Sequence, residues 1–104
     1  MNEAIARAEK IVAQFPENEL ARFSLGKAWF DAGDFPRALE QFAPALARKP
    51  DWMVVHILTG KCHLSLGDKN AARQSFVRAR QLAIDQHHEG PLAEMDTLLQ
   101  DLEP

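Results

Sequence analysis

Histidine and cysteine are the side chains of this sequence best suited to metal binding or nucleophilic chemistry, and they occur in two groups. His56, Cys62 and His63 lie close together, and His87 and His88 are adjacent. A metal site needs ligands that converge on one ion. If His56 and His63 lie on one helix, about 10 Å of helix separates them, which is too far for a single ion. We therefore expect no metal site and assign these side chains structural roles.

Glycine followed by lysine occurs twice, at Gly26-Lys27 and Gly60-Lys61, and phosphate-binding loops contain the same pair. Those loops also need an earlier glycine and a Ser or Thr directly after the lysine, where this chain has Ala28 and Cys62. Nor does any serine have a histidine and an acid in a recognisable nucleophilic arrangement. We predict neither phosphate binding nor catalysis, and no cofactor.

Composition narrows the class of protein further. The 104 residues are 46% hydrophobic and 26% charged, with a formal charge of -3, which is ordinary for one globular domain and gives no electrostatic reason to bind nucleic acid or an anionic membrane. The single Cys62 excludes an internal disulfide, and the first residues do not read as a signal peptide. No apolar run approaches the roughly 20 residues of a membrane span, so we expect a cytoplasmic protein.

The two Gly-Lys pairs belong to a longer internal repeat. Residues 24–34 and 58–68 both contain Gly-Lys, five further residues and Gly-Asp, at an offset of 34 residues. The same offset continues through identical alanine and phenylalanine residues farther along the chain. The identical pairs are Gly26/Gly60, Lys27/Lys61, Gly33/Gly67, Asp34/Asp68, Ala38/Ala72, Phe42/Phe76 and Ala45/Ala79.

Apolar residues within each repeat recur at helical spacing on both sides of the Gly-Asp pair, which predicts two helices joined by a short turn. Glycine ends the first helix and aspartate caps the second. Gly26 lies inside a helix, where glycine costs about 1 kcal/mol relative to alanine. We expect it to mark a close crossing against Ala38, with Phe42 beside it, and the same at Gly60.

This unit resembles the tetratricopeptide repeat, whose signature is Leu-Gly, an aromatic residue, and then spaced Ala, aromatic, Ala and Pro. The first copy matches it at Leu25-Gly26, Trp29, Ala38, Phe42, Ala45 and Pro50. The second copy is weaker, because Thr59, His63 and Ile84 replace the leucine, the aromatic residue and the proline. The resemblance implies an all-α fold of antiparallel helix pairs.

We predict a single domain over residues 1–104 with about two and a half repeats and six helices. Residues 1–16 form a second helix without its first, 18–50 and 52–84 form the two repeats, and 91–103 form a helix that caps the open end. The helix from about Lys69 is expected to run on until Gly90-Pro91 stops it. Pro44 is expected to bend its helix near Glu40 without ending it.

In the resembled family the first helix of each unit lines a concave surface. The residues opposite the Gly-Ala crossing would face it, and six of these eight are apolar. An apolar patch with two lysines is typical of a site for a protein or peptide that is apolar and carries an acid. The predicted partner-binding residues are Leu20, Phe23, Lys27, Phe30, Val54, Ile57, Lys61 and Leu64.

Two alternatives to an open groove remain. The C-terminal helix could fold back and bury the same residues as ordinary core. The apolar surface could instead be a self-association surface, which would make the protein a homodimer rather than an adaptor.

Overall fold

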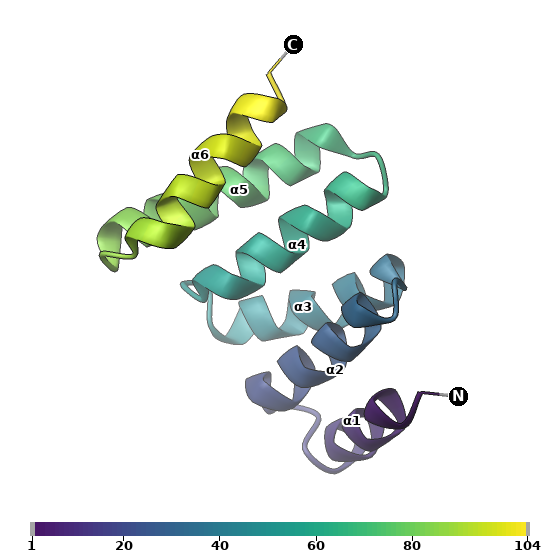
Figure 1. The fold of residues 1–104 in the computed structure, drawn as a ribbon. Coiled ribbons are helices and arrows are strands. Elements are labelled where there is room, and N and C mark those ends of the chain that lie inside the picture. Colours follow the sequence, from purple (N-terminus) through teal and green to yellow (C-terminus); the bar gives the residue numbers. More distant parts are fainter. Residues whose placement is uncertain (1, 104) are drawn as a thin grey trace. The chain divides into compact units, whose positions relative to one another are not determined.

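Residues 2–103, which the computed structural model describes, form six α-helices and no β-strand (Figure 1). This confirms the all-α fold of helix pairs. The helices are α1 (Glu3–Gln14), α2 (Glu19–Asp31), α3 (Phe35–Arg48), α4 (Met53–Ser65), α5 (Lys69–Asp85) and α6 (Glu89–Asp101).

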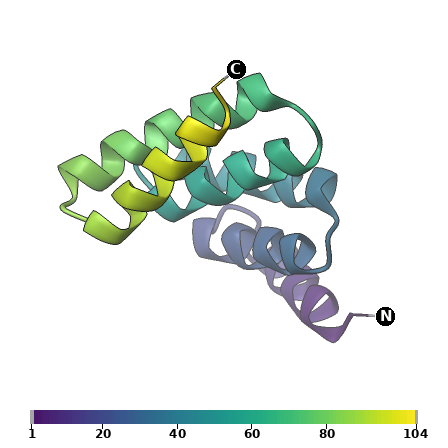
Figure 2. The same cartoon turned by 45° about the horizontal axis from the view of Figure 1, so that its top comes forward.

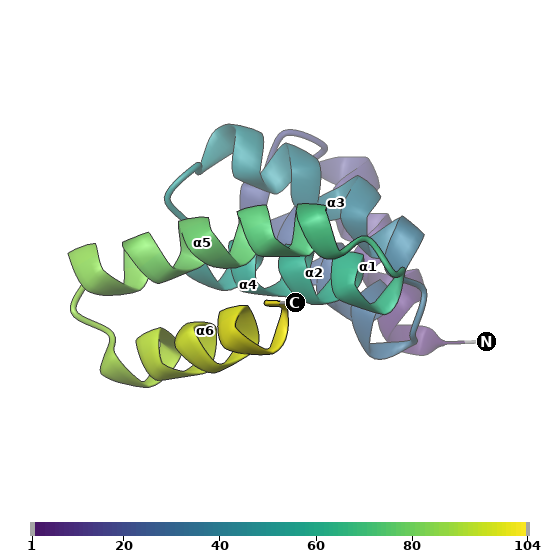
Figure 3. The same cartoon turned by 90° about the horizontal axis from the view of Figure 1, so that it is seen from above.

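The helices fall into two compact units of three helices each, residues 2–50 and residues 51–103. Within the first unit α2 packs against both α1 and α3, and within the second α5 packs against both α4 and α6. Figures 2 and 3 show α6 lying along α5. Each unit therefore has a central helix with a neighbour on either side.

The Gly-Asp pairs form the turns that the sequence predicts. Gly33 has φ 81° and Gly67 has φ 83°, in the left-handed region that favours glycine. Asp34 then accepts a hydrogen bond from the backbone N–H of Arg37, and Asp68 accepts the equivalent bond from Ala71. Both turns thus end one helix and cap the next within a few residues.

The glycines inside helices mark the close crossings that hold each pair together. A Cβ on Gly26 would lie 2.6 Å from Cε1 of Phe42 and 3.3 Å from the carbonyl oxygen of Ala38. Gly60 lies against Phe76 in the same way. Both rings are fully buried, so the glycines make room for the largest side chains of the core.

Two prolines have different outcomes. Helix α3 continues through Pro44, as expected. The expectation that Gly90-Pro91 ends the preceding helix is wrong, because both lie in the first turn of α6, where the missing N–H of proline costs nothing. Helix α5 ends at Asp85 instead, and His87 takes the left-handed conformation with φ 60°.

Candidate functional site

In the second unit, α6 covers most of the α4 face that the sequence analysis assigned to a groove. Ile57 is only 6% exposed and belongs to a core cluster with Met95 and Leu102 of the C-terminal segment. Leu64 packs on the same cluster. Nζ of Lys61 lies 3.0 Å from a carboxylate oxygen of Glu94 on α6. These α4 side chains are therefore engaged within their own unit.

Val54 differs from the other predicted residues of α4, because 39% of it is exposed. It lies in the first turn of the helix.

In the first unit the corresponding face of α2 is more open. Leu20 is 61% exposed, and Lys27 forms an ion pair of 2.7 Å with Asp31 on the same helix. Phe23 and Phe30 are half-buried. Phe23 stacks at a tilt on Phe42, and the Phe30 ring lies edge-on to that of Phe35, with ring centres 6.3 and 5.6 Å apart respectively.

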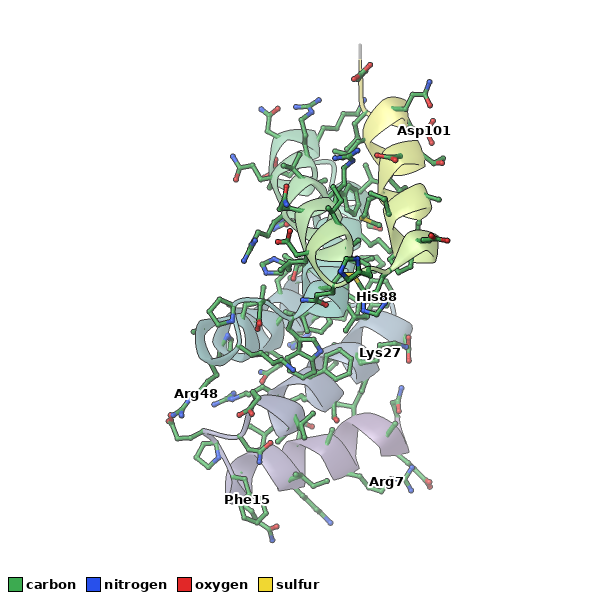
Figure 4. The ribbon with its side chains drawn as sticks, turned by 90° about the vertical axis from the view of Figure 1, so that its left-hand side faces the viewer. Arg7, Phe15, Lys27, Arg48, His88 and Asp101 are labelled. Carbon is green, nitrogen blue, oxygen red and sulfur yellow. The ribbon has the colours of Figure 1, made fainter. Side chains whose placement is uncertain are left out.

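Two hollows lie between α1 and α2, with volumes of about 390 and 300 Å³. Ala8, Ile11 and Ser24 line both, so we treat the two as one feature and call it the α1–α2 groove. In Figure 4, Arg7 and Phe15 lie toward opposite ends of α1. The groove is lined by Ala4, Arg7, Ala8, Ile11 and Phe15 of the first segment and by Asn18, Leu20, Ala21, Phe23, Ser24, Lys27, Ala28 and Asp31 of the second.

The walls of the groove are mainly apolar and carry one uncompensated charge. Ile11 and Phe15 are 48% and 57% exposed. Lys27 and Asp31 neutralise each other. Arg7 forms no ion pair with any residue of the described part of the chain. The groove therefore offers an apolar surface with a free guanidinium group on its α1 side.

The contribution of α1 was missed by the sequence analysis, which placed only first helices on the binding surface. The signal was available, since residues 1–16 were assigned to a second helix without its first. A helix without its usual neighbour exposes the side that the neighbour would cover. That side here includes Ala4, Arg7 and Ile11.

The histidines and the cysteine form no arrangement of ligands. Cys62 is fully buried, and burial raises the pKa of its thiol to about 11. Within residues 2–103, no three His, Cys, Asp or Glu side chains come together in a way that would hold a metal ion. In that same range every helix is too short or too polar to cross a membrane.

Comparison with known proteins agrees with the repeat pattern. A family model described as tetratricopeptide repeat matches residues 1–59. The TPR repeat-containing protein PA0015 of Pseudomonas aeruginosa is 33% identical over 95 residues, which cover 91% of this chain and 90% of that protein.

Two solved structures show the same fold. The solution structure of protein BPP2914 from Bordetella parapertussis has a TM-score of 0.83 at 29% identity and covers 98% of this chain and 89% of that one. The crystal structure of PcrH in complex with the chaperone binding region of PopB has a TM-score of 0.73 at 26% identity, over 79% of this chain and 67% of that one. The signature residues, the helix pairs and these matches together show that the chain belongs to the tetratricopeptide repeat family.

Proposed function

We propose that this chain, a protein–protein interaction module of tetratricopeptide type, is a non-catalytic adaptor that binds a segment of a partner protein in the α1–α2 groove. The partner segment is apolar and carries at least one acidic side chain. Leu20, Phe23 and Lys27 of the predicted site line this groove, and residues of α1 complete it.

The observation that carries the proposal is a concentration of exposed apolar side chains around one hollow. Ile11, Phe15 and Leu20 are three of the seven large hydrophobic residues that are exposed among residues 2–103. All three line the groove. Exposed apolar side chains gathered at a concave site favour binding of an apolar partner, because their burial removes them from water.

Charge gives the proposed site its polarity. The pair between Lys27 and Asp31 is exposed on both sides, and such pairs contribute about 1 kcal/mol or less. An incoming carboxylate can therefore compete with Asp31 for the lysine while Arg7 supplies a second cation. Ile57, Lys61 and Leu64 are left out of the proposed site, because α6 occupies them.

The PcrH structure supports a role of this kind, since that protein holds the chaperone binding region of PopB. The test is affinity capture from a native cell extract with mass spectrometry as the readout. A double variant, Phe23→Ala with Lys27→Glu, is compared with wild type and with Ile84→Ala plus Lys69→Glu, which changes exposed residues of the second unit.

A protein retained by the wild type and the control, and lost by the groove variant, is the expected result. Equal retention by all three folded proteins would overturn the assignment to the groove.

A further inference from the structure

We infer that the α1–α2 groove receives an amphipathic helix of a partner protein, with a large apolar side chain at its centre followed directly by an acidic residue. The inference rests on the proposed function and specifies the shape and chemistry of the partner. It follows from comparing the two units of the chain, each described by itself.

The second unit contains a complete set of three helices that serves as a template. Helix α4 packs against α5, and it also reaches α6 through Ile57, which shares a core cluster with Met95. In the repeat register, α1 corresponds to α5 at twice the 34-residue offset, and α2 and α6 are the first helices that follow them. Residues 2–50 contain no helix in the place of α4, and the groove is the surface that such a helix would cover.

The size of the central side chain follows from one substitution within the repeat. Gly60 of α4 leaves space for the ring of Phe76. Ala8 occupies the register position of Phe76 on α1, and it lines both hollows of the groove. With alanine in place of the ring, a docked helix with glycine at this point would leave a void. A large apolar residue there fills the hollow, and close packing favours it.

The acidic residue follows from the charges on the two units. On α4 the residue after the glycine is Lys61, which pairs with Glu94. Because α4 and α5 run antiparallel and Gly60 faces Phe76, Lys61 lies level with Ser75, whose register counterpart on α1 is Arg7. The groove thus presents a cation where the template has a neutral residue, and an acid at the position of Lys61 complements it.

The same charge argues for a different protein rather than a second copy of this chain. The α1 residues that line the groove are Ala4, Arg7, Ala8, Ile11 and Phe15, with no carboxylate among them. If α1 of a second copy docked in the groove, it would bring a second Arg7 to the interface and no partner for the first. Like charges at an interface are unfavourable.

The experiment uses two fluorescent peptides and the full chain, with binding followed by anisotropy. Both peptides carry the α4 sequence, Met53–Ser65, with Lys61→Glu, Cys62→Ser and a short lysine tail for solubility. One also carries Gly60→Leu, and the other keeps the glycine. We expect the leucine peptide to bind at least about tenfold more tightly, which corresponds to about 1.4 kcal/mol.

Two variants of the chain test size and charge separately. Ala8→Phe restores the ring of the repeat, so the preference should reverse in favour of the glycine peptide. Arg7→Glu should weaken binding of the leucine peptide about tenfold, whereas Arg78→Glu, an exposed arginine of α5, should leave it unchanged. Circular dichroism establishes that each variant is folded, and if Ala8→Phe is not, the two peptides with wild type and Arg7→Glu still decide.

Absence of binding by either peptide, or equal binding of both, would overturn the inference. Capture of an extract protein through the groove together with failure of both peptides would leave the proposed function standing and remove only the helical partner. If the chain's mass in sedimentation rises with concentration and Ile11→Lys abolishes the rise, the occupant is a second copy and the inference is wrong.

Discussion

The backbone of Gly26 lies directly against the ring of Phe42, so that an added Cβ would lie 2.6 Å from Cε1 of that ring. Gly60 and Phe76 repeat this contact 34 residues later. The signature glycine of the repeat is therefore a packing requirement, set by the aromatic residue of the second helix.

Gly26→Ala should destabilise the protein by about 1–3 kcal/mol, because the overpacking penalty exceeds the gain in helix propensity. The ring and the carbonyl of Ala38 leave the methyl group no open side. Urea unfolding measures the change. Gly90→Ala is the matched control, since Gly90 is also helical and its Cβ would meet nothing within 4 Å. If the two variants are equally stable, crowding at Gly26 is not what the glycine avoids.

The helices and turns were predictable because their determinants are local. Gly33 and Asp34 specify a turn by their own backbone and side-chain preferences, and the 34-residue register repeats the same solution at Gly67 and Asp68. The end of α5 was not predictable in this way. There the left-handed position falls on His87, a residue type with no strong preference for it, while the glycine that drew attention lies inside α6.

The candidate site was only partly predictable, because it depends on which helices cover which. Ile57 and Leu20 occupy the same kind of position in the two predicted repeats, yet Ile57 is 6% exposed and Leu20 61%. Their own sequences do not distinguish them. The difference comes from α6, which packs over Ile57, and from the absence of an equivalent helix beside α1 and α2 among residues 2–50.

His87→Gly should stabilise the protein by about 0.5–1 kcal/mol, because a non-glycine residue with φ 60° carries a steric cost that glycine does not. The turn itself should persist, held by the hydrogen bond of 2.8 Å from the N–H of His88 to the carbonyl of Ala83. Thermal unfolding gives the change. His88→Gly, at a residue with φ -104°, should be neutral or destabilising, and an equal gain in both variants would point away from backbone strain.

Asp34 should make stability depend on pH in the acid range. Hydrogen bonding to the side chain of Arg37 lowers the pKa of Asp34 below its usual value. The folded state therefore favours the ionised form, and this contribution is present above the unfolded pKa and is lost as the pH falls through the folded pKa. Asp34→Asn keeps a cap oxygen but cannot ionise, so its stability should decline less than that of wild type between about pH 6 and pH 3. Urea midpoints across this range decide, and parallel curves for both proteins would contradict the role of Asp34.

Met95→Ala should cost about 2–5 kcal/mol, because the side chain is fully buried where α6 packs on the core of the second unit. Loss of this anchor loosens α6 from Ile57 and Leu64, so the variant should also bind a dye for exposed apolar surface before global unfolding begins. Glu94→Gln is the control on the same helix. It removes only the exposed ion pair with Lys61 and should change stability by about 1 kcal/mol or less, without dye binding. Equal effects of the two substitutions would mean that charge rather than apolar packing holds α6 over the α4 face, and the contrast between the covered face of α4 and the open face of α2 would then depend on salt.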